Sequence, residues 1–139
     1  MPIIKKVVDI KASPENVFDL IARPEDFPRY SSLIKKVTAI GHSAYHWIVD
    51  IYNIEFEWDA KVVELIKPER FAWQSIRGIQ NSGSYTLKPI KNGTRITFSM
   101  EYLLPNIILE ELAQVITEGY MERMASEILE NVKKELENS

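Results

Sequence analysis

The chain has no cysteine and only two histidines among its 139 residues. The lack of cysteine excludes disulfide bonds, thiolate catalysis and cysteine-ligated metal sites. His42 and His46 lie four residues apart in a segment whose pattern predicts a turn and a strand, so they do not share a helical face. Because most structural zinc sites need four ligands close together, we expect neither a metal site nor another cofactor.

Long apolar runs are also missing. No stretch approaches the ~20 apolar residues of a membrane span, and no signal-peptide pattern opens the sequence. These absences predict a cytoplasmic protein without stable membrane insertion. The formal net charge of −3 argues against a phosphate-binding surface and therefore against a nucleic-acid partner. The length predicts one domain over residues 1–139, as a monomer or a homodimer.

Most of the chain shows the two-residue alternation of strands. Residues 3–11 are rich in β-branched side chains and predict a first strand. Ser13 and Pro14 then predict the cap and first residue of a helix, and residues 24–30 predict a second short helix. From 33 to 104, apolar side chains alternate with polar ones, most cleanly at 54–63, which predicts an antiparallel meander with one buried face.

Turn signals divide this meander, and a long helix follows it. Residues 81–83 (Asn-Ser-Gly) predict a turn, and Asn92-Gly93 predicts a hairpin with a type I′ turn. Apolar residues spaced three and four apart predict a helix over about 107–137. Gly119 falls inside that helix, so we expect either a close packing partner there or a bend.

Together these elements predict an α+β fold, in which a curved antiparallel sheet of six or seven strands wraps around the long C-terminal helix. A curled sheet of this size leaves more volume than one helix fills, unless the inward side chains are large. Many are large, so aromatic side chains could simply fill the interior. Polar groups on the same inward stripes, at Ser75, Tyr85, Tyr102 and Arg123, instead favour a ligand cavity.

The sequence resembles the polyketide cyclase/dehydrase branch of the START-like (SRPBCC) superfamily of helix-grip ligand binders, which includes coenzyme-Q-binding proteins. The likeness lies in residues 10–30 and in WDAKVVE at 58–64, FAWQSIRG at 71–78, NSGSYTLKPI at 81–90 and NGTRITFSMEY at 92–102. The resemblance implies a deep cavity between the sheet and the final helix. By that likeness, together with the inward position of Arg123, the expected ligand-binding residues are Trp58, Trp73, Ser75, Tyr85, Phe98, Tyr102, Leu112, Ile116 and Arg123.

Three functions remain open at this point. The first is a non-catalytic binder or carrier of a small hydrophobic molecule, such as a lipid, quinone, isoprenoid or aromatic polyketide-like compound. The second is a cyclase or dehydratase that places its substrate by confinement in the same cavity. It would move protons with residues drawn from Tyr85, Tyr102, Arg123, His46 and Glu64, though no catalytic signature identifies them. The third is an interaction module that acts through its acidic C-terminal helix or through Phe27, Pro28 and Tyr30.

Overall fold

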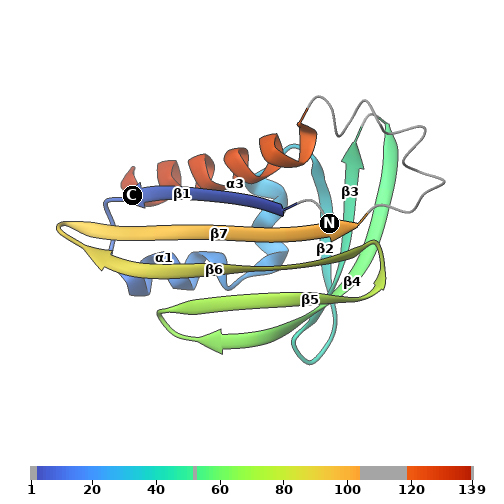
Figure 1. Cartoon of the computed structure of the whole chain (residues 1–139), viewed down its shortest axis with the longest axis horizontal. Helices are drawn as coiled ribbons and strands as arrows, with labels where there is room; N and C mark the ends of the chain where they lie inside the picture. The colour runs from blue at the N-terminus through green and yellow to red at the C-terminus, as the bar shows by residue number, and fades with distance from the viewer. Residues whose placement is uncertain (1–2, 52, 104–118, 139) are drawn as a thin grey trace.

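The fold is described from a computed structural model, which covers residues 3–51, 53–103 and 119–138. It has a seven-stranded sheet and three helical segments (Figure 1). The elements are, in chain order, β1 (Ile3–Ile10), α1 (Pro14–Ile21), the 3-10 helix η1 (Pro24–Arg29), β2 (Ile34–Gly41), β3 (Ala44–Ile51), β4 (Ile54–Ile66), β5 (Arg70–Gly78), β6 (Gln80–Ile90), β7 (Gly93–Leu103) and α3 (Tyr120–Glu137).

The strands form one antiparallel sheet in the order β1-β7-β6-β5-β4-β3-β2. Strands β2 to β7 are neighbours in the sheet in their order along the chain, whereas β1 is out of this order and pairs with β7, the last strand. In Figure 1, β1, β7 and β6 run across the page while β2 and β3 run up it, so the sheet bends through a large angle. The predicted α+β fold, with its curved sheet and C-terminal helix, is confirmed.

The bend lies in β4, which has 13 residues and is the longest strand. Register shifts interrupt its pairing with β5 between Asp59 and Ala60 and between Val62 and Glu64. A bulge adds a residue to one strand of a pair and increases the local twist. The two irregularities therefore turn the sheet over the helices, and they direct the inward side chains of β4 toward one interior.

The helices are placed by caps and by contacts from their polar sides. The predicted cap of α1 is confirmed, because Ser13 Oγ accepts a hydrogen bond from the Asn16 N–H at 3.2 Å. Asn131 of α3 donates its side-chain amide to the Tyr30 carbonyl at 2.8 Å, just after η1. Glu127 accepts the Ser32 N–H at 2.7 Å. Within the described residues, no helix is both long and apolar enough to cross a membrane.

Hydrogen bonds to the Glu127 carboxylate strengthen the contact between α3 and the segment after η1. Burial of the Glu127 carboxyl opposes its ionisation, but hydrogen bonds from Ser31 and Ser32 outweigh burial and lower its pKa. Nearer the C-terminal end of the same helix, Glu135 forms an ion pair with Arg29. The polar contacts therefore seat α3 against the segment that carries η1, and both elements contribute walls to the interior described below.

Two turn predictions were wrong, and of the two alternatives expected at Gly119 the close packing partner is not found. Residues 81–83 lie inside β6, and the chain turns at Gly78 and Ile79 instead. The β6–β7 hairpin is present, and its loop residues between the paired Ile90 and Gly93 are Lys91 and Asn92. Positive φ occurs at Asn92 and not at Lys91, so the turn is not type I′. Gly119 has a φ of 69° and precedes α3, with no neighbour within 4 Å of a Cβ placed there. Residues 107–118 of the predicted helix lie outside the described part of the chain.

Candidate functional site

A small cavity lies between the inner face of the sheet, η1 and α3. Its volume is about 50 Å³, and its walls are almost wholly apolar atoms. The lining residues come from η1, from all strands except β1, and from α3. They are Pro24, Phe27, Ile34, Tyr45, Trp47, Val49, Trp58, Ala60, Lys61, Val62, Phe71, Trp73, Asn81, Tyr85, Phe98, Met100, Met124 and Ile128.

Two stacked aromatic pairs form part of the cavity wall. Trp47 of β3 and Trp58 of β4 are a directly opposed cross-strand pair, with ring centroids 6.0 Å apart and planes 8° apart. Trp73 of β5 stacks on Phe98 of β7 across the intervening strand β6, with ring centroids 6.0 Å apart and planes 24° apart. Cross-strand aromatic pairs of this kind stabilise a sheet and present flat apolar surfaces.

Gly83 is the residue that permits the second stack. It sits on β6 directly opposite Trp73 on β5. A Cβ placed on Gly83 would lie 2.5 Å from the Trp73 ring and 2.6 Å from the Ser99 carbonyl oxygen. The sequence pattern predicts a turn at this glycine. In the structure, the absence of a side chain at Gly83 instead leaves room for the Trp73 indole ring on the sheet.

The rim of the cavity is marked by the lining residues that solvent reaches. Tyr45, Trp47, Val62 and Trp73 are half-buried, and Lys61 is exposed, whereas most of the other lining residues are buried. These partly exposed residues lie on β3, β4 and β5. The rim therefore faces the bent part of the sheet.

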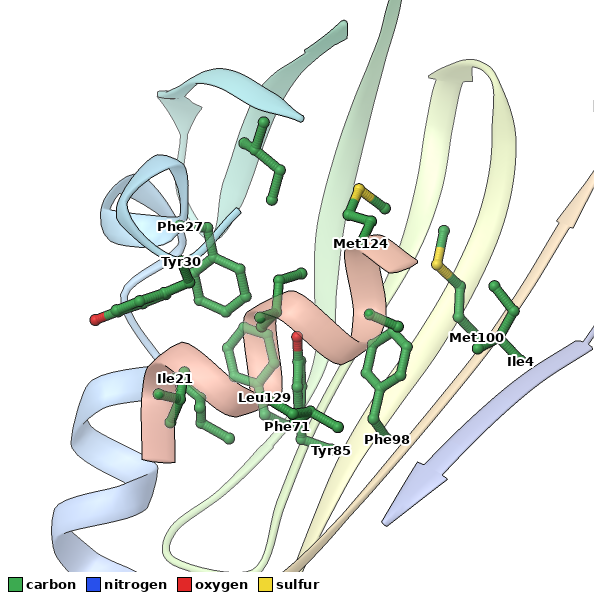
Figure 2. Close-up of a cluster of buried hydrophobic side chains, with 14 of the residues drawn as sticks. Ile4, Ile21, Phe27, Tyr30, Phe71, Tyr85, Phe98, Met100, Met124 and Leu129 are labelled. Atoms are coloured by element: carbon green, nitrogen blue, oxygen red, sulfur yellow. The ribbon is translucent and has the colours of Figure 1, made fainter. Parts of the chain in front are cut away.

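Four of the expected ligand-binding residues line this cavity, namely Trp58, Trp73, Tyr85 and Phe98. Figure 2 shows Tyr85 and Phe98 rising from the sheet toward α3, with Met100 and Met124 beyond them. The inward direction predicted for these side chains from the two-residue alternation is confirmed by their burial. Their role in binding remains a prediction.

Ser75 does not line the cavity. Its hydroxyl oxygen accepts the Asn81 N–H at 2.9 Å. The Asn81 side chain in turn accepts the Trp73 indole N–H at 2.9 Å and donates to the Ile79 carbonyl at 2.9 Å. This network closes the β5–β6 turn, so the polar group expected at the site has a structural partner.

Tyr102 and Arg123 lie away from the cavity as well. Tyr102 is buried outside the cavity lining, and burial and then the nearby Glu122 carboxylate raise the pKa of its phenol. Arg123 is exposed, with its guanidinium 4.9 Å from the centre of the Tyr120 ring. The buried face of α3 includes Met124, and a helix turns by about 100° per residue, so the side chain before Met124 points elsewhere. Leu112 and Ile116 lie outside the described residues.

The remaining candidates for proton transfer are on the outer face of the sheet. Arg70 donates to the Glu64 carboxylate at 2.9 Å. His46 alternates with the cavity residues Tyr45 and Trp47 along β3, and its ring bonds two carboxylates of β4, at 2.5 Å to Asp59 and 3.0 Å to Glu57. Both contacts hold adjacent strands together, and neither reaches the interior.

The cavity lining also contains residues that are not among the expected ligand-binding residues, including Phe27, Ala60 and Met124. Phe27 is 3% exposed and meets Trp47 edge-on at 5.7 Å, so it is a wall of the cavity and not an exposed docking residue. Its position between two prolines in η1 is a local signal of a fixed turn. That signal does not say which element the ring will face.

His46 predicts a pH dependence of stability. Its hydrogen bonds to Asp59 and then Glu57 raise its pKa above the ordinary value of 6.5. The two contacts therefore stabilise the fold fully below about pH 6.5, and this stabilisation is lost as the pH rises through the raised pKa. We expect the free energy of unfolding of His46→Gln, measured by urea titration, to fall less than that of the wild type over this range.

His42 supplies the matched control, since it is the other histidine of the sequence and is exposed. His42→Gln should show the pH profile of the wild type. A His46→Gln protein that loses as much stability as the wild type over the same pH range would contradict the assignment.

The fold is a helix-grip fold, with a curved antiparallel sheet, two short helices after the first strand and a C-terminal helix. Solved structures share it across nearly their whole length. A Thermus thermophilus protein matches with a TM-score of 0.83 at 19% identity, covering 97% of each chain. A START superfamily protein from Mycobacterium smegmatis matches at 0.70 and 15%, covering 98% of this chain and 97% of that one. The Zhui aromatase/cyclase of a Streptomyces species matches at 0.75 and 15%, covering 98% and 93%.

The family model described as "Polyketide cyclase / dehydrase and lipid transport" matches residues 1–137. The chain belongs to this family. A curated relative from Streptomyces lincolnensis, an uncharacterized 17.2 kDa protein, is 22% identical over 136 residues, which cover 96% of this chain and 89% of the relative. The resemblance noted from the sequence is thereby confirmed at the level of the family.

Proposed function

We propose that this protein binds or carries a small hydrophobic ligand, such as a lipid, quinone, isoprenoid or aromatic polyketide-like molecule, in the cavity between the sheet and α3. The observation that carries the proposal is an apolar void, lined in large part by aromatic side chains that do not interlock to fill it. Protein interiors are normally close-packed, and atoms that line a void lose dispersion contacts. An apolar guest restores those contacts.

The size of the cavity implies that its walls move when a ligand enters. Its volume of about 50 Å³ is well below the ~300–1,000 Å³ of sites that hold drug-sized ligands. Met100 of β7 and Met124 of α3 both reach the cavity (Figure 2). Unbranched thioether side chains change rotamer at low cost, so these two residues are the part of the wall best suited to yield.

The distribution of titratable groups supports binding over catalysis. Acid–base catalysis needs proton donors and acceptors within hydrogen-bond reach of one substrate. Of the five candidates, Tyr85 alone lines the cavity. His46 and Glu64 lie on the outer face, while Tyr102 and Arg123 lie near the start of α3. A cyclase or dehydratase remains the alternative.

Tryptophan fluorescence tests the proposal directly, because all three tryptophans of the sequence line the cavity. Burying ~300 Å² of apolar ligand surface at about 25 cal/mol per Å² contributes about 7 kcal/mol before association costs, which corresponds to micromolar affinity. We expect one class among quinones, isoprenoids, lipids and aromatic compounds to change the emission of Trp47, Trp58 and Trp73 saturably in this range.

Single-tryptophan replacements separate cavity binding from surface binding. Trp58→Phe and Trp73→Phe should each lose part of the signal, while the remaining tryptophans report a dissociation constant of similar size. A ligand recovered chemically unchanged after incubation supports carriage, and a converted ligand supports the enzymatic alternative. Unchanged emission of the folded protein across the whole panel, up to the solubility of each compound, would overturn the proposal.

A further inference from the structure

The hydroxyl of Tyr85 faces the cavity without a hydrogen-bond partner among the described residues. Tyr85 lies on β6 between Phe71 of β5 and Phe98 of β7, its direct cross-strand neighbours. Its ring centre is 5.1 Å from that of Phe98, and its side chain is 2% exposed. Figure 2 shows the ring standing off the sheet between these two phenylalanines, with its oxygen directed toward the interior and α3.

The Tyr85 oxygen makes no hydrogen bond with any residue in the described part of the chain, although it is in contact with the cavity space. Burial alone raises the pKa of the phenol, so the group is a neutral O–H. Tyr30 shows the contrast, because its hydroxyl points the other way and donates to Glu135 at 3.0 Å. A buried water needs two to four polar partners, and an apolar cavity offers too few to hold one here.

The other polar groups of the described lining are few. The Asn81 amide is already bonded to Trp73 and Ile79. Lys61 is exposed, and Tyr45 and Trp47 are half-buried at the rim. Trp58 is buried, and its indole N–H is a donor and not an acceptor. A carboxylate inside the cavity would therefore be buried without a cation, at a cost in affinity.

We propose that the ligand is uncharged and carries an acceptor oxygen, such as a ketone carbonyl on an otherwise apolar framework, which accepts a hydrogen bond from Tyr85. This inference rests on the proposed function and goes further by setting the chemistry of the ligand. It excludes fatty-acid carboxylates as preferred ligands. The hydroxyl, left unsatisfied in the empty protein, is satisfied when the carbonyl binds.

Three compounds of nearly the same shape test this chemistry: ethylbenzene, acetophenone and benzoate. Calorimetry or NMR titration of each gives dissociation constants for the wild type, for Tyr85→Phe and for the control Tyr102→Phe. The control removes the hydroxyl of a buried tyrosine outside the cavity lining. The quantity compared between proteins is the ratio of the acetophenone to the ethylbenzene dissociation constant, because general effects of a substitution on the cavity change both constants and cancel in the ratio. We expect Tyr85→Phe to shift this ratio against acetophenone by about fivefold or more, the usual contribution of one hydrogen bond, and Tyr102→Phe to leave it unchanged.

A thermal unfolding measurement without ligand guards against a misfolded variant. Because the Tyr85 hydroxyl has no partner in the empty protein, Tyr85→Phe should melt at the wild-type temperature or above it. An unchanged ratio in Tyr85→Phe, or benzoate binding as tightly as acetophenone, would overturn the inference while leaving the proposed function intact. If none of the three compounds binds the wild type, this small-ligand form of the proposed function fails and the inference falls with it.

Discussion

Replacing Gly83 with alanine is expected to lower the free energy of unfolding by about 1–3 kcal/mol, the usual cost of overpacking. The added methyl group would lie 2.5 Å from the Trp73 ring and 2.6 Å from the Ser99 carbonyl oxygen. The carbonyl belongs to the backbone of β7, which is paired on both sides and has no room to withdraw. The ring must therefore lift, which strains its hydrogen bond to Asn81 and its stack on Phe98.

Urea unfolding and near-ultraviolet circular dichroism together measure this effect. The unfolding midpoint reports the loss of stability, and the dichroism reports displacement of the Trp73 indole. Gly41→Ala is the matched control, because a Cβ at Gly41 on the edge strand β2 meets no atom within 4 Å. Equal stability of the two variants would show that Gly83 is not needed to seat the ring.

Replacing Ala60 with leucine should reduce ligand affinity at least tenfold while the protein still folds. Ala60 is 3% exposed and points into the cavity between Trp58 and Val62. Leucine adds three carbon atoms where a space of about 50 Å³ is available, so the new side chain takes the place of the guest. The packing it gains offsets part of the strain, and we expect a change in the free energy of unfolding of no more than about 1–3 kcal/mol.

The measurement is the tryptophan-emission titration with whichever ligand binds the wild type. Ala44→Leu serves as the control, because Ala44 begins the neighbouring strand β3 and lies outside the cavity lining. It should leave the dissociation constant unchanged. Full affinity in a folded Ala60→Leu protein would place the ligand outside this cavity.

Much of the fold could be read from local pattern. A strand exposes alternate residues to opposite faces, so the spacing of apolar residues in 56–60 and 96–102 already says which side chains are buried. The cap at Ser13 is equally local, since the hydroxyl bonds the N–H three residues on. These features depend on neighbours along the chain, and the structure confirms them.

The glycines mark where this local reasoning fails. Gly83 looks like a turn residue in the sequence, but its role is set by the indole of Trp73 on another strand. Ser75 looks like a polar group facing a ligand, but the Asn81 N–H meets it across the β5–β6 turn. In both cases the deciding partner comes from a different strand, and spacing along one strand does not reveal it.

The sequence by itself determined which side chains of the central strands turn inward and which family the chain belongs to, because both depend on residue order and periodicity. Only the tertiary structure decided which inward residues enclose the cavity. The register shifts between β4 and β5 curve the sheet, and contacts from Glu127 and Asn131 seat α3 beside η1. Those elements come together through contacts distant in sequence. The resulting geometry leaves the Tyr85 hydroxyl facing an apolar space while its polar neighbours are paired.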